Sequence, residues 1–170
     1  VLQSPRDTQL YVLTDQHGMP SWEWVRWLPH VRPQSGQDTV ATIGLDAETC
    51  ARRIAELTAM IAARSEEARE NRDVTFPDVV VIFDGARRLR TLPGVVAILK
   101  QGPDLGIRSI CLDADERTLP EEANAVVLQT AYGLLLRQMR VTVVKKIVPD
   151  LVDGPWLQRV SRSMAPLRDI

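Results

Sequence analysis

Apolar residues recur along the chain with two different periods, which predict helices and strands in turn. The longest helix is expected from about Ala47 to Arg72, because apolar residues return there every three or four positions. Asp46 is expected to cap its first turn, with Thr49 three residues further on. Shorter helices are expected over 22–27, 93–100 and 153–165. Helices therefore separate most of the expected strands.

The clearest strand signal is an unbroken apolar run from Val79 to Phe83. A run of this kind is typical of a strand that is buried on both faces, as in a parallel sheet. Other strands are expected over 8–13, 39–43, 107–112 and 124–128, and residues 132–148 look rich in β structure. The alternation of strands and helices predicts an α/β fold with right-handed crossovers.

Length and composition are those of one ordinary globular domain. The 170 residues are 45% hydrophobic and 25% charged, which argues against disordered, collagen-like and disulfide-scaffold proteins. No apolar run reaches the roughly 18 residues of a membrane span, and no signal peptide is visible. The net charge of −1 provides no positive field for nucleic acid. A start at Val1 suggests a piece of a longer protein.

The cysteines and histidines do not form a recognisable site in the sequence. Cys50 and Cys111 lie far apart, which fits two buried apolar thiols in a reducing compartment better than a disulfide or a zinc site. His17 and His30 have no ligand partner at metal-binding spacing. We therefore expect no metal centre from these four residues.

Acidic residues follow three of the expected strands. Asp15, Asp84 and Asp113 stand where ligands gather in an open α/β sheet, beyond the carboxyl ends of the strands. Asp84 follows the most apolar strand, where a nucleotide hydrolase places the carboxylate that holds magnesium. A metal-dependent enzyme that uses Asp84, Asp113 and Asp115 is one hypothesis that the sequence leaves open.

Phosphate-binding motifs are absent from the chain. None of its nine glycines is followed by lysine, and there is no Gly-x-Gly-x-x-Gly motif. The chain alone therefore lacks the usual loop that wraps nucleotide phosphates. Arg87, Arg88 and Arg90 cluster just after Asp84, where they could meet an anion or the carboxylates of a partner, or form a solvated loop.

Several segments, in matching order, resemble FtsK/SpoIIIE motor ATPases, whose fold is RecA-like. The resembling segments are Ser4–Leu10, Val79–Asp84, Leu92–Gly94 and Gly102–Arg108. The stretch Trp24–His30 is similar to the first, degenerate ATPase-like module of the EccC proteins of type VII secretion. Met164–Asp169 looks like the linker that leaves that module in actinobacterial proteins, and the predominance of arginine suits such a source. The resemblance covers nearly the whole chain.

Departures from the family pattern predict a catalytically inactive module. Asp84 matches the Walker B aspartate, but Gly85 stands where the family has the catalytic glutamate. Asp113 stands at the sensor position, where a carboxylate would repel the γ-phosphate. The family's arginine after Gly102 is Pro103. The resemblance places the first strand and the P-loop upstream of Val1, so the RecA-like (P-loop NTPase-like) sheet is expected to lack its N-terminal strand.

The resemblance implies a non-catalytic module, at residues 1–170, of a membrane-associated translocase that works in type VII-like protein secretion. Residues 152–170 would hold the last helix and the start of a linker. The module would lie in the cytoplasm and meet neighbouring ATPase domains and other subunits of a hexamer-like motor. We expect no cofactor in this chain, since ATP and magnesium would bind the other domains. Trp22, Trp24 and Trp27 could form the contact with a partner, or pack their short segment onto the sheet.

An alternative reading is a fragment of an ATP-binding DNA translocase domain. It would require a Gly-Lys-Ser/Thr loop upstream of Val1. The nearly neutral charge and the scarcity of lysine (Lys100, Lys145 and Lys146) argue against direct DNA contact.

Overall fold

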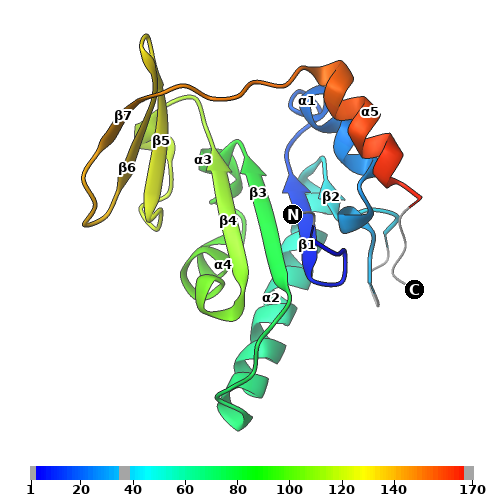
Figure 1. Cartoon of the computed structure of the whole chain (residues 1–170). Helices are drawn as coiled ribbons and strands as arrows, with labels where there is room; N and C mark the ends of the chain where they lie inside the picture. The colour runs from blue at the N-terminus through cyan, green and yellow to red at the C-terminus, as the bar shows by residue number, and fades with distance from the viewer. Residues whose placement is uncertain (1–2, 35–38, 167–170) are drawn as a thin grey trace.

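Four parallel strands form the central sheet of the protein (Figure 1). The computed structural model describes residues 3–34 and 39–166, and all structural statements below concern these residues. The strands lie in the order β2-β1-β3-β4. Their bounds are Thr8–Leu13 (β1), Ile43–Gly44 (β2), Asp78–Asp84 (β3) and Ile107–Leu112 (β4). The expected α/β class is confirmed, and the arrangement is compatible with a Rossmann-like or RecA-like fold.

Helices connect the strands and flank the sheet. The α-helices are Met19–Trp22 (α1), Ala47–Glu70 (α2), Ala86–Leu89 (α3), Val95–Gln101 (α4) and Gly154–Met164 (α5); the 3-10 turns are Glu23–Trp27 (η1), Pro29–Val31 (η2), Pro103–Leu105 (η3) and Glu116–Thr118 (η4). The long helix begins where the sequence predicts, because the Asp46 carboxylate accepts a bond from the Thr49 amide at 2.8 Å. The Thr49 hydroxyl in turn accepts a bond from the Asp46 amide at 3.1 Å, so threonine completes the capping box in place of glutamate.

The main core lies between the sheet and helices α2 and α4. Alternate residues of β3, Val79, Val81 and Phe83, point into it and are almost completely buried. Leu57 of α2 and Ile98 of α4 are fully buried against them. Burying one such side chain stabilises the fold by about 1.5–3 kcal/mol. This layer accounts for the apolar spacing that predicts both helices.

At β1, the opposite face of the sheet is covered by the turns η1 and η2. Val12, Val25 and Val31 form a small buried cluster there, supplied by β1, η1 and η2. Helix α5 packs on η1, where the Arg162 guanidinium lies 5.1 Å from the centre of the Trp27 ring (Figure 1). On β4 the alternate side chains of this face remain exposed, so the covering layer does not reach that edge.

A second, antiparallel sheet follows the parallel one. It contains β5 (Ala125–Thr130), β6 (Gly133–Gln138) and β7 (Val144–Ile147), in that order. The sequence predicts strands here but gives no sign that they leave the main sheet. The two-residue connection from Thr130 to Gly133 decides this, because such a short turn can join only antiparallel strands. Gly133 has a φ of +113° in this turn, which favours glycine.

Two predicted elements differ in extent from those observed. The strand expected over 39–43 is reduced to β2, because the Thr42 amide donates to the Val31 carbonyl of η2 and only the Thr42 carbonyl bonds to β1, at the Val12 amide. The helix expected over 22–27 is instead the end of α1 followed by the 3-10 turn η1. Parts of the predicted polar loop at 32–38 and of the linker at 164–169 lie outside the described residues.

Candidate functional site

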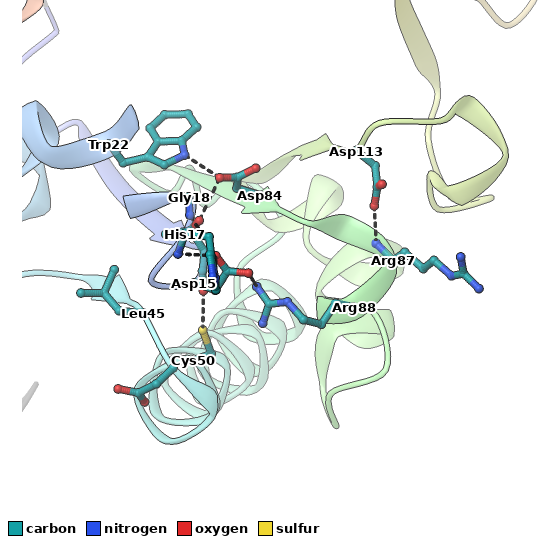
Figure 2. Close-up of polar contacts among 12 residues, drawn as sticks. Asp15, His17, Gly18, Trp22, Leu45, Cys50, Asp84, Arg87, Arg88 and Asp113 are labelled. Carbon is teal, nitrogen blue, oxygen red and sulfur yellow. Dashed lines mark hydrogen bonds and ion pairs between the residues drawn. The ribbon is translucent and has the colours of Figure 1, made fainter. Parts of the chain in front are cut away.

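A polar cluster occupies the carboxyl ends of β1 and β3 (Figure 2). At its centre, the Asp84 Oδ2 oxygen accepts one hydrogen bond from the Trp22 indole Nε1 and one from the Thr14 hydroxyl, both at 2.8 Å. Trp22 lies 62 residues earlier in the chain, at the end of α1. These two bonds join α1, β1 and β3 at the point where the strands end.

Gly18 makes this cluster possible through its small size. A Cβ atom at this position would lie 2.2 Å from the Thr14 hydroxyl oxygen and 2.6 Å from Asp84 Oδ2. Its backbone has φ −76° and ψ −27°, which any residue can adopt, so the requirement is for space. Sequence analysis did not single out Gly18 or Thr14. Thr14 directly follows β1 and Gly18 directly precedes α1, and these positions are the signal that could have found them.

Asp15 orders the turn that leads from β1 into α1. Its Oδ1 oxygen accepts bonds from the amides of His17 and Gly18, each at 2.9 Å. Its Oδ2 oxygen lies 3.5 Å from the Arg88 guanidinium. The Gly18 amide, followed by the His17 amide and the Arg88 charge, holds the pKa of Asp15 below its usual value. This carboxylate is therefore engaged by the protein's own groups.

Gly85 and Asp113 shape the turn after β3. Gly85 has a φ of +85°, in the left-handed region, and leads directly into α3. The Asp113 Oδ2 oxygen accepts a bond from the Arg87 amide at 2.9 Å, and its Oδ1 oxygen accepts one from the Ala114 amide at 2.8 Å. The Arg87 amide is the main cause that lowers the pKa of Asp113. Asp113 thus ties the end of β4 to the first turn of α3.

The three predicted arginines lie on or just after a short helix, not on a loop. Arg88 pairs with Asp15, as described above. Arg90 pairs with Glu121 at 3.2 Å and with Glu122 at 3.0 Å, which links α3 to the segment before β5. The Arg87 side chain is exposed and points away from the cluster in Figure 2. Arg87 is therefore the member of this group best placed to meet another molecule.

The three tryptophans have different neighbours. Trp22 and Trp24 stack with ring centres 6.5 Å apart, and both are half-buried. Trp27 is 39% exposed and lies under Arg162. Trp22 and Trp24 pack against the buried cluster of Val12, Val25 and Val31, although the residue that η1 buries completely is Val25.

The carboxylates proposed as metal ligands do not converge. Asp115 caps η4 and binds the Arg117 side chain at 2.6 Å, while Asp84 and Asp113 have the separate partners given above. Within the described part of the chain, no three His, Cys, Asp or Glu side chains are grouped so that they could hold a metal ion. The structure therefore gives the metal-dependent enzyme hypothesis no site.

Both cysteines are free thiols, and Cys50 is buried as the sequence predicts, whereas Cys111, near the end of β4, is only half-buried. Cys50 is buried, and its sulfur lies 3.6 Å from the Thr14 carbonyl oxygen at the rim of the cluster. Burial raises the pKa of Cys50 and raises that of Cys111 to about 11. Neither thiol has the lowered pKa of a nucleophilic cysteine.

Comparisons with known proteins assign no family to this arrangement. No family model, no curated protein and no solved structure matches the chain. Among the described helices, none combines the length and the apolar character needed to cross a membrane. The function must therefore be argued from the cluster itself.

Proposed function

We propose that this chain is a catalytically inactive, RecA-like ATPase module of an FtsK/SpoIIIE-type translocase, acting through contacts with neighbouring proteins. The setting would be type VII-like protein secretion, on the cytoplasmic side of a membrane-associated protein. The order of the resembling segments along the chain supports this proposal, together with a parallel sheet in which Asp84 ends a buried strand. ATP and magnesium would bind other domains of that protein.

The observation that carries the proposal is that the Asp84 carboxylate is hydrogen-bonded to other side chains of the protein. A Walker B carboxylate must be available to hold a hydrated magnesium ion. The Oδ2 oxygen of Asp84 instead accepts bonds from Trp22 and Thr14, which come from the protein's own α1 and β1. The position where a hydrolase would have a general base holds Gly85, which has no side chain to orient water.

The end of β4 supports the same conclusion. In a working motor this position would sense the γ-phosphate, which requires a donor or a cation. Asp113 is an acceptor, and it already binds the amides of Arg87 and Ala114. A negative charge here would repel a phosphate. Both strand ends are thus used for structure, which leaves the exposed surfaces of the module for binding.

An ATPase assay on the 170-residue chain, with magnesium, tests this function. We expect phosphate release no faster than in protein-free buffer. The Gly85→Glu variant should gain no activity, and it should lose about 1 kcal/mol of stability because a residue with a side chain must adopt the left-handed conformation. Magnesium-dependent hydrolysis by the unaltered chain, abolished in Asp84→Asn, would contradict the proposal, because it would show that the Asp84 carboxylate serves a nucleotide.

A further inference from the structure

Residues 137–148 form a strongly basic part of the antiparallel sheet, which we call the basic hairpin. They comprise the end of β6, its connection to β7, β7 itself and the next residue. This run holds four cations, and no aspartate or glutamate occurs anywhere between residues 123 and 149. The whole chain has a net charge of −1, so the remainder of the chain is net negative. The basic hairpin is therefore a positively charged segment of an otherwise acidic protein.

Three of the four cations are available to another molecule. Arg140, Lys145 and Lys146 are exposed and pair with no carboxylate of the described residues. Arg137 differs, because it pairs with Glu116 of η4. Unpaired cations that have no acidic neighbours in the sequence favour a partner with many negative charges.

Apolar side chains stand exposed among these cations. Met139 is 66% exposed, Val141 is 53% exposed and Val148 is 85% exposed, while Val143 and Val144 are also exposed. Exposed apolar patches mark sites of contact with proteins or membranes. The partner of the basic hairpin must therefore offer both negative charge and an apolar phase.

The basic hairpin lies away from the parallel sheet. A groove of about 430 Å³ separates β4 from the start of β5, and β6 and β7 follow β5 in that order. Strand β7 is thus the edge of the second sheet that is remote from β4 (Figure 1). A strand added to the parallel sheet beside β4 would meet β5 first and would leave residues 139–148 exposed.

The shape and chemistry of the basic hairpin favour a lipid surface over a folded protein or a nucleic acid. Residues 139–146 are exposed in succession, so their side chains project in several directions rather than from one flat face. The cavities beside β4 and beside η4 have none of these residues in their walls. The run 137–148 has no aromatic side chain on which a base could stack. A bilayer surface needs neither a pocket nor stacking, since its acyl boundary accepts apolar side chains and its headgroups accept cations.

We propose that the basic hairpin binds the surface of a bilayer that contains anionic phospholipids. Met139, Val141 and Val143 would enter the boundary between headgroups and acyl chains, and the three free cations would lie at the headgroups. The hairpin would stay out of the hydrocarbon core, because the backbone groups of its connection need water. Repulsion of the acidic remainder of the chain would turn the hairpin toward the lipid. The charges and the exposure of residues 137–148 carry this inference independently of the proposed function.

Co-sedimentation of the 170-residue chain with lipid vesicles tests this inference. The vesicles contain phosphatidylcholine alone or phosphatidylcholine with phosphatidylserine. Each Lys or Arg near an anionic surface strengthens binding by roughly fivefold, so three free cations predict about 100-fold tighter binding to the vesicles with phosphatidylserine. Raising the salt concentration from about 0.05 M to about 0.5 M should weaken this binding by about tenfold or more. Equal binding to both kinds of vesicle, or binding to neither, would overturn the proposal.

Two charge variants separate the position of the cations from the overall charge. Lys145→Glu combined with Lys146→Glu should weaken binding to the anionic vesicles by about 25-fold or more, because two attractive groups become repulsive. Arg69→Glu combined with Arg72→Glu makes the same change of net charge at the exposed end of α2 and just after it, and should weaken binding by less than about threefold. Equal losses in the two variants would contradict the proposal, since overall charge would then account for the binding.

Apolar variants distinguish a bilayer from another polyanion. Met139→Ser combined with Val141→Ser should weaken binding to the anionic vesicles by about tenfold. Val40→Ser, at a 93% exposed position just before β2, should have no effect. Binding to polyglutamate or to duplex DNA that is tighter than binding to the vesicles, and that the serine variant leaves unchanged, would identify an acidic polypeptide or a nucleic acid as the occupant and refute the proposal.

Discussion

Replacing Asp84 with alanine is expected to lower the free energy of unfolding by about 3 kcal/mol. The change leaves the Trp22 indole and the Thr14 hydroxyl without their acceptor, and each unpaired donor in a partly buried site costs about 1–3 kcal/mol. Asp84→Asn should cost less, about 1 kcal/mol, because its amide oxygen can still accept both bonds. Urea titration followed by tryptophan fluorescence measures both variants.

The direction of this change separates a structural from a catalytic carboxylate. Catalytic and ligand-binding groups are often held at the expense of stability, so their removal is commonly neutral or stabilising. The exposed Asp73, in the turn after α2, provides the control, and Asp73→Ala should change stability by less than about 0.5 kcal/mol. An Asp84→Ala variant as stable as the unaltered protein would show that the bonds from Trp22 and Thr14 do not contribute to the free energy of unfolding.

Replacing Gly18 with alanine is expected to cost about 2–3 kcal/mol, although only one methyl group is added. The new Cβ would meet Thr14 at 2.2 Å and Asp84 at 2.6 Å, so both side chains must move and their shared bond must break. The backbone conformation itself suits alanine, so the whole loss reflects crowding. Thermal unfolding by circular dichroism should show the lower stability as a fall in Tm of several degrees.

Gly154 provides the matched control for this substitution. It is the first residue of α5, and a Cβ there would have no heavy atom within 4 Å. Gly154→Ala should therefore be neutral, or more stable by up to about 1 kcal/mol, because alanine is less flexible in the unfolded chain. Equal losses in the two variants would contradict the account of Gly18, since they would show that local crowding is not the cause.

Elements with a regular stripe or an unbroken run of apolar residues could be predicted from the sequence. The helix α2 and the strand β3 appear where the spacing of apolar residues places them, because each buries a regular stripe or run of side chains. The α/β class follows from their order. The antiparallel sheet β5-β6-β7 could not be separated from the parallel one, because short strands of either kind have similar composition.

The candidate site could be predicted only in part. Asp84 and Asp113 were found because each directly follows an expected strand. The partners that decide their roles are remote in sequence, as Trp22 is 62 residues from Asp84 and Arg87 is 26 residues from Asp113. The short helix that carries Arg87 depends on Gly85 and on the Asp113 carboxylate, so its local sequence looks like a charged loop.

Calorimetric titration of the 170-residue chain with magnesium-ATP tests the central claim most directly. With the Asp84 Oδ2 oxygen bonded to Trp22 and Thr14, and a carboxylate at the sensor position, we predict no saturable binding with a Kd below about 1 mM, and no change in tryptophan fluorescence. Saturable, magnesium-dependent binding in the micromolar range that Asp84→Asn abolishes would contradict the claim, because it would show that this carboxylate still serves a nucleotide.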